Sequence, residues 1–256
     1  MANALDQAVG DTSQMEEILD KYPKRIGKPF ECLLIPPMMR PKMLAKLVDA
    51  GLVRVQTGIE SGSAKESKEI HNRSPGNRAI MKFAEFNKEL KLNVVYDVIV
   101  DNPHATEEMK IETAEFLLDL PRPYDIYFYS LNYFPGTALT RQALADGMLD
   151  PNEVEGRANK SWYQFRVSMD WPRSDEDRFY LALFCLASKS FVPKALIRKF
   201  LDEREYWKQN VEPIFMLAQA TNMAKMAWVA ARYFKNGELT WFKIRQYGDL
   251  SQMISQ

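Results

Sequence analysis

Cysteine is scarce in this sequence, which has Cys32 and Cys185 as its only two among 256 residues. They lie far apart and form no CxxC pair, so we predict neither a disulfide framework nor a cysteine-based metal site. Both are interpreted as buried core thiols. The two histidines, His71 and His104, are not spaced as metal ligands, so we interpret each as a loop residue and predict no metal site.

The sequence also lacks a net charge and a long apolar run. Its 34 Lys and Arg residues balance 34 Asp and Glu residues, so bulk electrostatics give no reason to expect a nucleic-acid partner. No apolar stretch approaches the roughly 20 residues that a membrane span requires, and the first residues do not have the pattern of a signal peptide. We therefore predict a cytoplasmic protein without a membrane partner.

Apolar periodicity predicts an alternation of helices and strands up to about residue 150. Repeated units of this length join parallel strands by right-handed crossovers, so we predict an α/β fold, either a barrel or a doubly wound sheet, with about four parallel strands. The predicted helices span residues 11–22, 40–51, 76–92, 106–120 and 138–147, and the predicted strands lie within residues 29–35, 53–57, 93–100 and 124–137.

The pattern changes after a polar linker at residues 150–160. Residues 174–192, 193–211 and 213–234 are long, helical in pattern and rich in Met and aromatic side chains. We therefore divide the chain into an α/β domain, residues 1–150, and a helical C-terminal region, residues 151–256. The Met and aromatic residues are interpreted as packing surface, with a cofactor-binding role as the alternative.

One strand ends in an unusual loop, in the stretch "VRVQTGIESGS" at residues 53–63. Gly58 and Gly62 mark places where the backbone turns or lets another group approach closely. Glu60 is therefore placed at the mouth of a strand, where its carboxylate can accept from an ammonium group or a ribose hydroxyl. Ser61 and Ser63 either cap the next helix or bind the same ligand.

The ends of parallel strands share one edge of a sheet, and sites are assembled there from several strands at once. We therefore expect residues 36–39, 58–63, 97–103 and 132–137 to lie around one small-molecule site. Arg73 could add a planar cation suited to a carboxylate, with a solvated surface arginine as the alternative. The sequence shows no P-loop, no Ser-His-Asp arrangement and no zinc signature, so no catalytic residue is assigned.

Three segments, taken in order, resemble a known family. They are "DAGLVRVQTGIESGSAKESKEIHNRSP", "VVYDVIVDNPHATEEMKIETAEFLLDL" and "SLNYFPGTALTRQALADGM". Together they resemble the later strands of radical S-adenosylmethionine (SAM) enzymes, and most closely the branch with methylthiotransferases and cobalamin-binding members. The resemblance covers roughly residues 30 to 150 and implies a partial TIM-type (β/α) barrel in which a reduced 4Fe-4S cluster cleaves SAM.

The resemblance also implies roles for residues of this chain. Glu60 and Ser61, next to Gly58, would lie near the methionine or ribose part of SAM, and Arg73 near its carboxylate. The strand that contains Asp97 would lie near the adenosine. The "FPGT" segment resembles the family's closing loop over the site, which Pro135 and Gly136 would shape. SAM is thus the expected cofactor, and cobalamin is a possible second one.

The chain departs from the family in two places. The CxxxCxxC motif that holds the cluster is absent from this sequence, and Cys32 cannot replace three thiolates. Asp101 and Asn102 stand where many relatives have a glycine. The chain therefore resembles the carboxyl-terminal portion of a longer enzyme, and we expect it to be inactive alone and to need a cluster-bearing segment or to self-associate. The alternative is a non-catalytic half-barrel that uses its Met-rich helices to bind a protein partner.

Overall fold

A computed structural model of the chain describes residues 12–35, 41–72, 76–100, 102–150, 152, 154 and 174–237. The chain forms two compact units. Unit 1 comprises residues 1–98, 107–127 and 188–190, and unit 2 comprises residues 99–106, 128–187 and 191–256. The division at residue 150 suggested by the sequence is a different one and stays a prediction.

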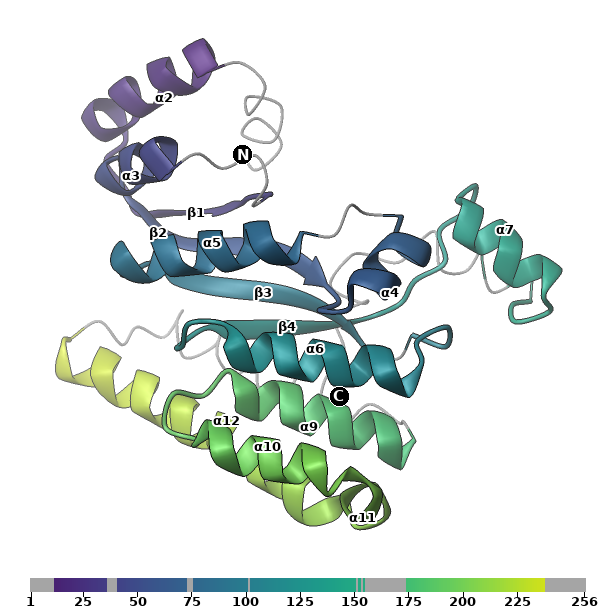
Figure 1. Cartoon of the computed structure of the whole chain (residues 1–256). Coiled ribbons are helices and arrows are strands. Elements are labelled where there is room, and N and C mark those ends of the chain that lie inside the picture. The colour runs from purple at the N-terminus through teal and green to yellow at the C-terminus, as the bar shows by residue number, and fades with distance from the viewer. Residues whose placement is uncertain are drawn as a thin grey trace. The chain divides into compact units, whose positions relative to one another are not determined.

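Four strands form one sheet in the order β1-β2-β3-β4 (Figure 1). They are β1 (Phe30–Leu33), β2 (Leu52–Glu60), β3 (Asn93–Val100) and β4 (Asp125–Ser130). β1 pairs with β2, and β2 with β3, in parallel. The predicted class, an α/β protein with about four parallel strands followed by helices, is therefore confirmed. The partial TIM-type barrel stays a prediction.

The helices of unit 1 alternate with these strands, as the periodicity predicts. They are α2 (Thr12–Arg25), α3 (Pro41–Asp49), α4 (Ala64–Glu69), α5 (Asn77–Glu89) and α6 (Glu107–Asp119). Pro41 starts α3, where its missing N–H costs nothing, and Gly51 follows the helix with a φ of +112°. Glu107 and Glu108 occupy the first turn of α6, where the helix dipole favours negative charge.

Unit 2 is mainly helical. Its helices are α7 (Ala138–Ala145), α9 (Asp175–Ala187), α10 (Lys194–Asp202), α11 (Arg204–Gln209) and α12 (Glu212–Lys235). Every residue of α9 from Phe179 to Ala187 is buried, and α10, α11 and α12 each pack against it. A helix that is apolar all round needs cover on all sides, so α9 is the core helix of this unit. The three helical stretches expected after residue 174 are confirmed, the second as two helices.

The sheet has one apolar face and one polar face. On β2 the side chains of Val55, Thr57 and Ile59 are buried, whereas Arg54 and Gln56, which alternate with them, are only half-buried. Alternation of this kind follows from the period of two in a strand. The half-buried face therefore carries the polar groups that a ligand could reach.

β1 is an edge strand, because among the described strands it pairs with β2 alone. Leu33 beside this edge is 55% exposed, and Ile35 just beyond it is 64% exposed. Short length and the charge of Glu31 limit the use of such an edge as a template for pairing. An unpaired edge is thus present in the described sheet, and the self-association expected from the sequence stays a prediction.

Candidate functional site

Glu60 ends β2 in a left-handed conformation, with a φ of +62°. The pairing of β2 with β3 shifts register between Gly58 and Glu60, so the strand bulges just before its end. A residue with a side chain pays roughly 1 to 2 kcal/mol for this conformation, which glycine adopts freely. The half-buried carboxylate is therefore held at the strand mouth at a cost to stability.

Gly58 lies beside Asp97 of β3 in the parallel register. The Nε2 atom of Gln56 donates to both oxygens of Asp97, at 2.8 and 2.9 Å. Because Gly58 has no side chain, the space next to Asp97 on this face is left to the carboxylate and its amide partner. Two polar side chains from neighbouring strands are thus fixed in one orientation, directly before the strand ends.

Arg54 adds a cation to the same face, nearer the start of β2. Its Nη1 lies 3.2 Å from Oε1 of Glu31 on β1. Burial would lower the pKa of the Arg54 guanidinium. Electrostatic attraction by Glu31 on β1, and by Tyr127 and Asp125 on β4, nevertheless raises that pKa above its ordinary value. Arg54 therefore stays charged at any pH at which the protein is folded.

The loop after Glu60 turns its hydroxyls inward. Ser61 is 2% exposed, and its Oγ donates to Oε2 of Glu66 at 2.7 Å and accepts from the backbone N–H of Ser63 at 3.0 Å. Ser63 is the N-cap of α4, with its Oγ accepting from the N–H of Glu66 at 3.3 Å. Ser63 therefore caps the helix, and the observed partners of Ser61 are groups of the protein itself.

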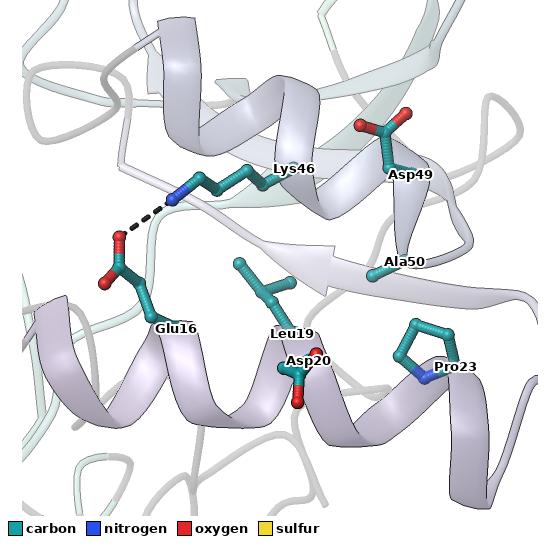
Figure 2. Close-up of a pocket in the computed structure, with 7 residues that line it drawn as sticks. All are labelled: Glu16, Leu19, Asp20, Pro23, Lys46, Asp49 and Ala50. Atoms are coloured by element: carbon teal, nitrogen blue, oxygen red, sulfur yellow. Dashed lines mark hydrogen bonds and ion pairs between the residues drawn. The ribbon is translucent and has the colours of Figure 1, made fainter.

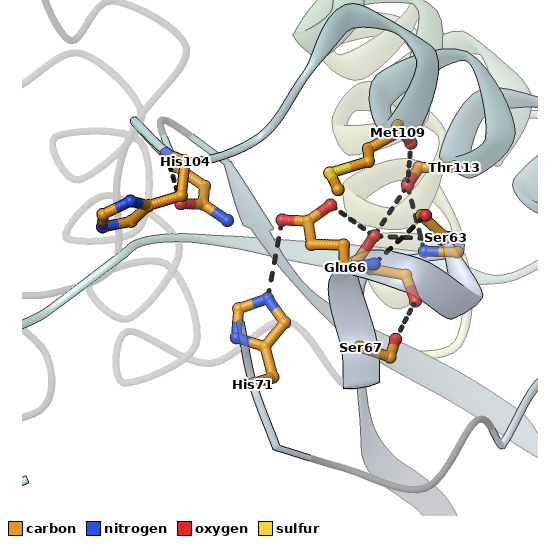
Figure 3. A network of polar contacts seen from close by, with 10 residues as sticks. Ser63, Glu66, Ser67, His71, His104, Met109 and Thr113 are labelled. Carbon is orange, nitrogen blue, oxygen red and sulfur yellow. Dashed lines mark hydrogen bonds and ion pairs between the residues drawn. The ribbon is translucent and has the colours of Figure 1, made fainter. Parts of the chain in front are cut away.

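Glu66 is the charged centre of this loop and is only 4% exposed (Figure 3). Its Oε1 lies 3.5 Å from Nε2 of His71, and the two side chains are 5% and 6% exposed. This contact is not a hydrogen bond, since Nε2 of His71 has no hydrogen-bond partner in the described part of the chain. The buried Glu66 carboxylate is thus in contact with Ser61 on one oxygen and His71 on the other.

Helix α6 completes the network through Thr113. Its Oγ1 donates to the carbonyl of Met109 at 2.9 Å, accepts from the N–H of Gly62 at 3.0 Å, and lies 2.9 Å from Oγ of Ser61. A Cβ atom on Gly62 would lie 2.8 Å from Cα of Thr113 and 2.7 Å from Cβ of Phe116. Gly62 is thus required for close packing of the strand-end loop on α6.

The residues predicted for the site fall into three groups. Gly58, Glu60, Ser61 and Asp97 all lie at the ends of β2 and β3 in unit 1. Pro135 and Gly136 lie in an exposed turn of unit 2, where Gly136 has a φ of +81°. Arg73, residues 36–39 and Asp101 lie outside the described residues.

Sequence reasoning missed Gln56, Glu66, His71 and Thr113. Gln56 alternates correctly with Gly58, so its position on the polar face was available from the pattern. Glu66 follows Ser63 by three residues, the spacing of a capping box, which hinted at a helix start but not at burial of the carboxylate. Thr113 is 52 residues beyond Ser61, and only the packing of α6 brings it to the loop.

Unit 2 has a separate polar pair after β3. Nε2 of His104 lies 3.1 Å from the phenol oxygen of Tyr133, and the backbone N–H of His104 donates to Oδ1 of Asn102 at 3.0 Å. His104 lies in a turn and His71 in a bend, so both histidines are outside helices and strands, as interpreted. Sequence reasoning did not find the contact with Tyr133.

A cavity of about 300 Å³ lies between α2 and α3 (Figure 2). Glu16 on α2 pairs with Lys46 on α3 at 2.8 Å, and this hydrogen bond and charge lower the pKa of the Glu16 carboxyl. The cavity is also lined by Ala50, two residues before β2 begins. It is therefore at the amino end of β2, away from the strand mouths, and is not the site that the topology predicts.

The two cysteines do not fit an iron-sulfur cluster. Cys32 and Cys185 are both buried, and Sγ of Cys185 donates to Oδ1 of Asn222 at 3.3 Å. Within the described ranges, no three Cys, His, Asp or Glu side chains gather as a metal site. The three thiolates that hold a 4Fe-4S cluster in the radical SAM family are not in this sequence.

No helix in the described part of the chain is both long and apolar enough to cross a membrane.

Anaerobic reconstitution of the purified chain with iron and sulfide is therefore expected to give no 4Fe-4S chromophore, because the chain has two buried thiols where the cluster needs three accessible ones. Iron content and the visible spectrum measure this. The double variant Cys32→Ala, Cys185→Ala is the matched control and should behave identically. A broad visible band with about four irons per chain, lost in the control, would contradict the expectation.

Polar side chains thus lie at the carboxyl ends of β2 and β3, the edge at which ligand sites are commonly assembled in parallel α/β folds. Residues 9–117, which are less than half of the chain, match the sequence model of the radical SAM superfamily. The match begins earlier than the resemblance seen in the sequence and ends before the "FPGT" segment at residues 134–137.

No curated protein matches the chain significantly. Among solved structures, the chain is similar to an archaeal Elp3 from Methanocaldococcus infernus with an N-terminal deletion, with a TM-score of 0.41 and 14% identity. That alignment covers 69% of this chain and 42% of the Elp3 chain, so this chain spans less than half the length of that protein.

Proposed function

We propose that the chain binds SAM, together with a small-molecule substrate, at the carboxyl ends of β2 and β3. The radical SAM domain sequence over residues 9–117 supports this, because it includes both strands. The membership of the branch with methylthiotransferases and cobalamin-binding enzymes is part of the proposal and rests on the order of the three sequence motifs.

The observation that carries the proposal is the left-handed Glu60. Glycine would adopt a φ of +62° without strain, and the chain uses glycine at Gly58 and Gly62 on either side. Strained non-glycine residues cluster at ligand sites, where the function of the side chain outweighs the loss of folding free energy that the strain causes. Glu60 is therefore retained for its carboxylate, which suits the ammonium group or the ribose hydroxyls of SAM.

Neighbouring groups have supporting roles in this proposal. The fixed pair of Gln56 and Asp97 offers hydrogen-bond acceptors for the adenosine part of SAM or for substrate. The network of Ser61, Glu66 and Thr113 holds the loop and thereby positions Glu60. SAM cleavage in the family requires a reduced 4Fe-4S cluster. Because the ligands of that cluster are not in this sequence, we assign the chain binding and positioning, with no radical step.

Titration of the full chain with SAM by calorimetry tests the proposal. We expect binding by the wild-type protein, and a loss of about 10- to 100-fold in affinity for Glu60→Ala and Glu60→Gly, since each removes charge-assisted hydrogen bonds of about 1.5 to 3 kcal/mol. Thermal unfolding separates the two roles of the residue. Glu60→Gly should be about 1 kcal/mol more stable than Glu60→Ala, because glycine relieves the left-handed strain that alanine keeps.

Glu69, an exposed carboxylate at the end of α4, provides the matched control. Glu69→Ala should bind SAM as the wild type does. Unchanged SAM affinity in both Glu60 variants, or the same loss in Glu69→Ala, would disprove the role of Glu60. Absence of SAM binding by the wild-type chain up to millimolar concentration would overturn the proposal itself.

A second candidate function is a non-catalytic half-barrel that binds a protein. One observation favours it: the outer face of α12 exposes Met216, Met223, Trp228 and Phe234, which are 63%, 70%, 63% and 75% exposed. Single exposed apolar residues are normal, but a row of large ones along one helix marks an interaction surface. Protein binding without SAM binding in the titration would select this candidate.

A further inference from the structure

Helix α12 has one face in the core of unit 2 and an opposite face that is exposed. Ile214, Phe215, Ala218 and Thr221 are buried on the inner face, and the helix packs against α9. On the outer face, six regularly spaced positions between Met216 and Phe234 carry exposed apolar residues. These positions, named here the seam, are Met216, Ala220, Met223, Ala227, Ala230 and Phe234.

The spacing of the seam is that of a coiled coil. Its intervals alternate between four and three residues, which keeps apolar side chains along one narrow line of a helix. The neighbouring positions Leu217, Ala224 and Ala231 are also exposed and apolar. A seam of this kind normally faces another helix, because water contact along five turns is unfavourable.

The seam is complementary to itself when two copies run antiparallel. With a two-fold axis at the level of Lys225, Met223 of one copy lies beside Ala227 of the other, so a large residue meets a small one. Ala220 then lies beside Ala230, and the two backbones can approach closely. Met216 lies beside Phe234 at each end, which closes the contact with large side chains. A parallel pair would instead place each residue beside its own copy, Met223 against Met223.

Charge favours the same orientation. Glu212 is in the first turn of α12, and Arg232 and Lys235 are in the last turn. An antiparallel pair places the acidic turn of one copy near the basic turn of the other, and it also opposes the two helix dipoles favourably. A parallel pair would bring like charges together at both ends.

We propose that α12 is a dimerisation helix, which pairs with α12 of a second copy of this chain in antiparallel orientation through the seam. Each copy brings three large exposed side chains of the seam, Met216, Met223 and Phe234, at roughly 100 to 150 Å² each, so the contact buries about 600 to 900 Å² in total. That area is below the standard size of specific interfaces, so the dimer is weak and forms only at the higher protein concentrations.

Sedimentation velocity of the full chain, between about 1 and 200 µM, tests this directly. We expect a monomer that converts to a dimer with rising concentration, and at least a tenfold weaker dimer for Met223→Glu, which places a charge in the centre of the seam. Phe191→Glu is the matched control, since Phe191 is 60% exposed in the same unit but lies outside α12. It should leave the dimer unchanged.

Disulfide crosslinking tests the orientation. Ala220→Cys and Ala230→Cys chains, mixed and oxidised, should form a crosslinked dimer, because residues 220 and 230 face each other across the pair. Either variant alone should not, since two copies of one position lie about 15 Å apart along the axis, beyond the reach of a disulfide. Efficient crosslinking of Ala220→Cys with itself would show a parallel pair and overturn the proposal.

Other occupants of the face have their own outcomes. A wild-type chain that stays monomeric at every concentration overturns the proposal. If Met223→Glu then also lowers the Tm by several degrees, the face is covered from within the chain. If Phe191→Glu weakens the dimer as much as Met223→Glu, the contact is unspecific and the seam has no role.

Discussion

Gly62→Ala is expected to lose about 3 kcal/mol of folding free energy, the upper end of what overpacking costs in a well-packed interior. The added Cβ would lie 2.7 Å from Cβ of Phe116 and 2.8 Å from Cα of Thr113. Neither atom is the end of a flexible side chain, so α6 must move away from the strand-end loop. Urea unfolding followed by circular dichroism measures the loss.

Gly147→Ala is the control for this change. Gly147 has a φ of +70° and no atom within 4 Å of an added Cβ, so alanine there pays only for its left-handed backbone. We expect a loss of about 1 kcal/mol. If Gly62→Ala is no more destabilising than Gly147→Ala, the contact between the loop and α6 is not as close as the structure has it.

The same substitution should have opposite effects at two buried threonines. Thr113→Val removes the acceptor for the N–H of Gly62 and a partner of Ser61, and leaves a buried donor without its bond. We expect a loss of about 2 kcal/mol. Thr57 is 1% exposed, and in the described part of the chain its Oγ1 has no hydrogen-bond partner. Thr57→Val therefore removes a buried polar group and should gain about 1 kcal/mol.

Valine has nearly the shape of threonine, so the pair of variants isolates the hydroxyl group. Unfolding of both, measured under one set of conditions, should differ by about 3 kcal/mol. A loss of stability in Thr57→Val would mean that its hydroxyl finds a partner in solution. No loss in Thr113→Val would mean that water reaches Gly62 and that the network is not sealed.

Local pattern was sufficient for most of the fold. Strand β3 spans residues 93–100 as the apolar run predicts, and α3 lies between Pro41 and Gly51 as its end signals predict. The short helix α4 was expected only through Ser63 as a cap, because its six residues are mostly charged and show no apolar face. Helix propensity and periodicity are weak over so few residues.

The candidate site was predictable only in part. Glu60 at the strand mouth followed from alternation and the flanking glycines, but its left-handed backbone and the bulge before it depend on the pairing with β3. The inward orientation of Ser61 depends on Thr113, a contact between residues 52 positions apart. Such contacts are set by tertiary packing, which no local pattern of the sequence contains.

The division of the chain into two units has a consequence for how it folds. The chain passes from one unit to the other after residues 98, 106, 127, 187 and 190. Strands β3 and β4 are both divided by these passages, so each unit is completed by a strand that begins or ends in the other. No single cut in the backbone releases either unit whole. The two units are therefore expected to be synthesised, folded and degraded as one, with neither available as an evolutionary module that could be gained or lost alone.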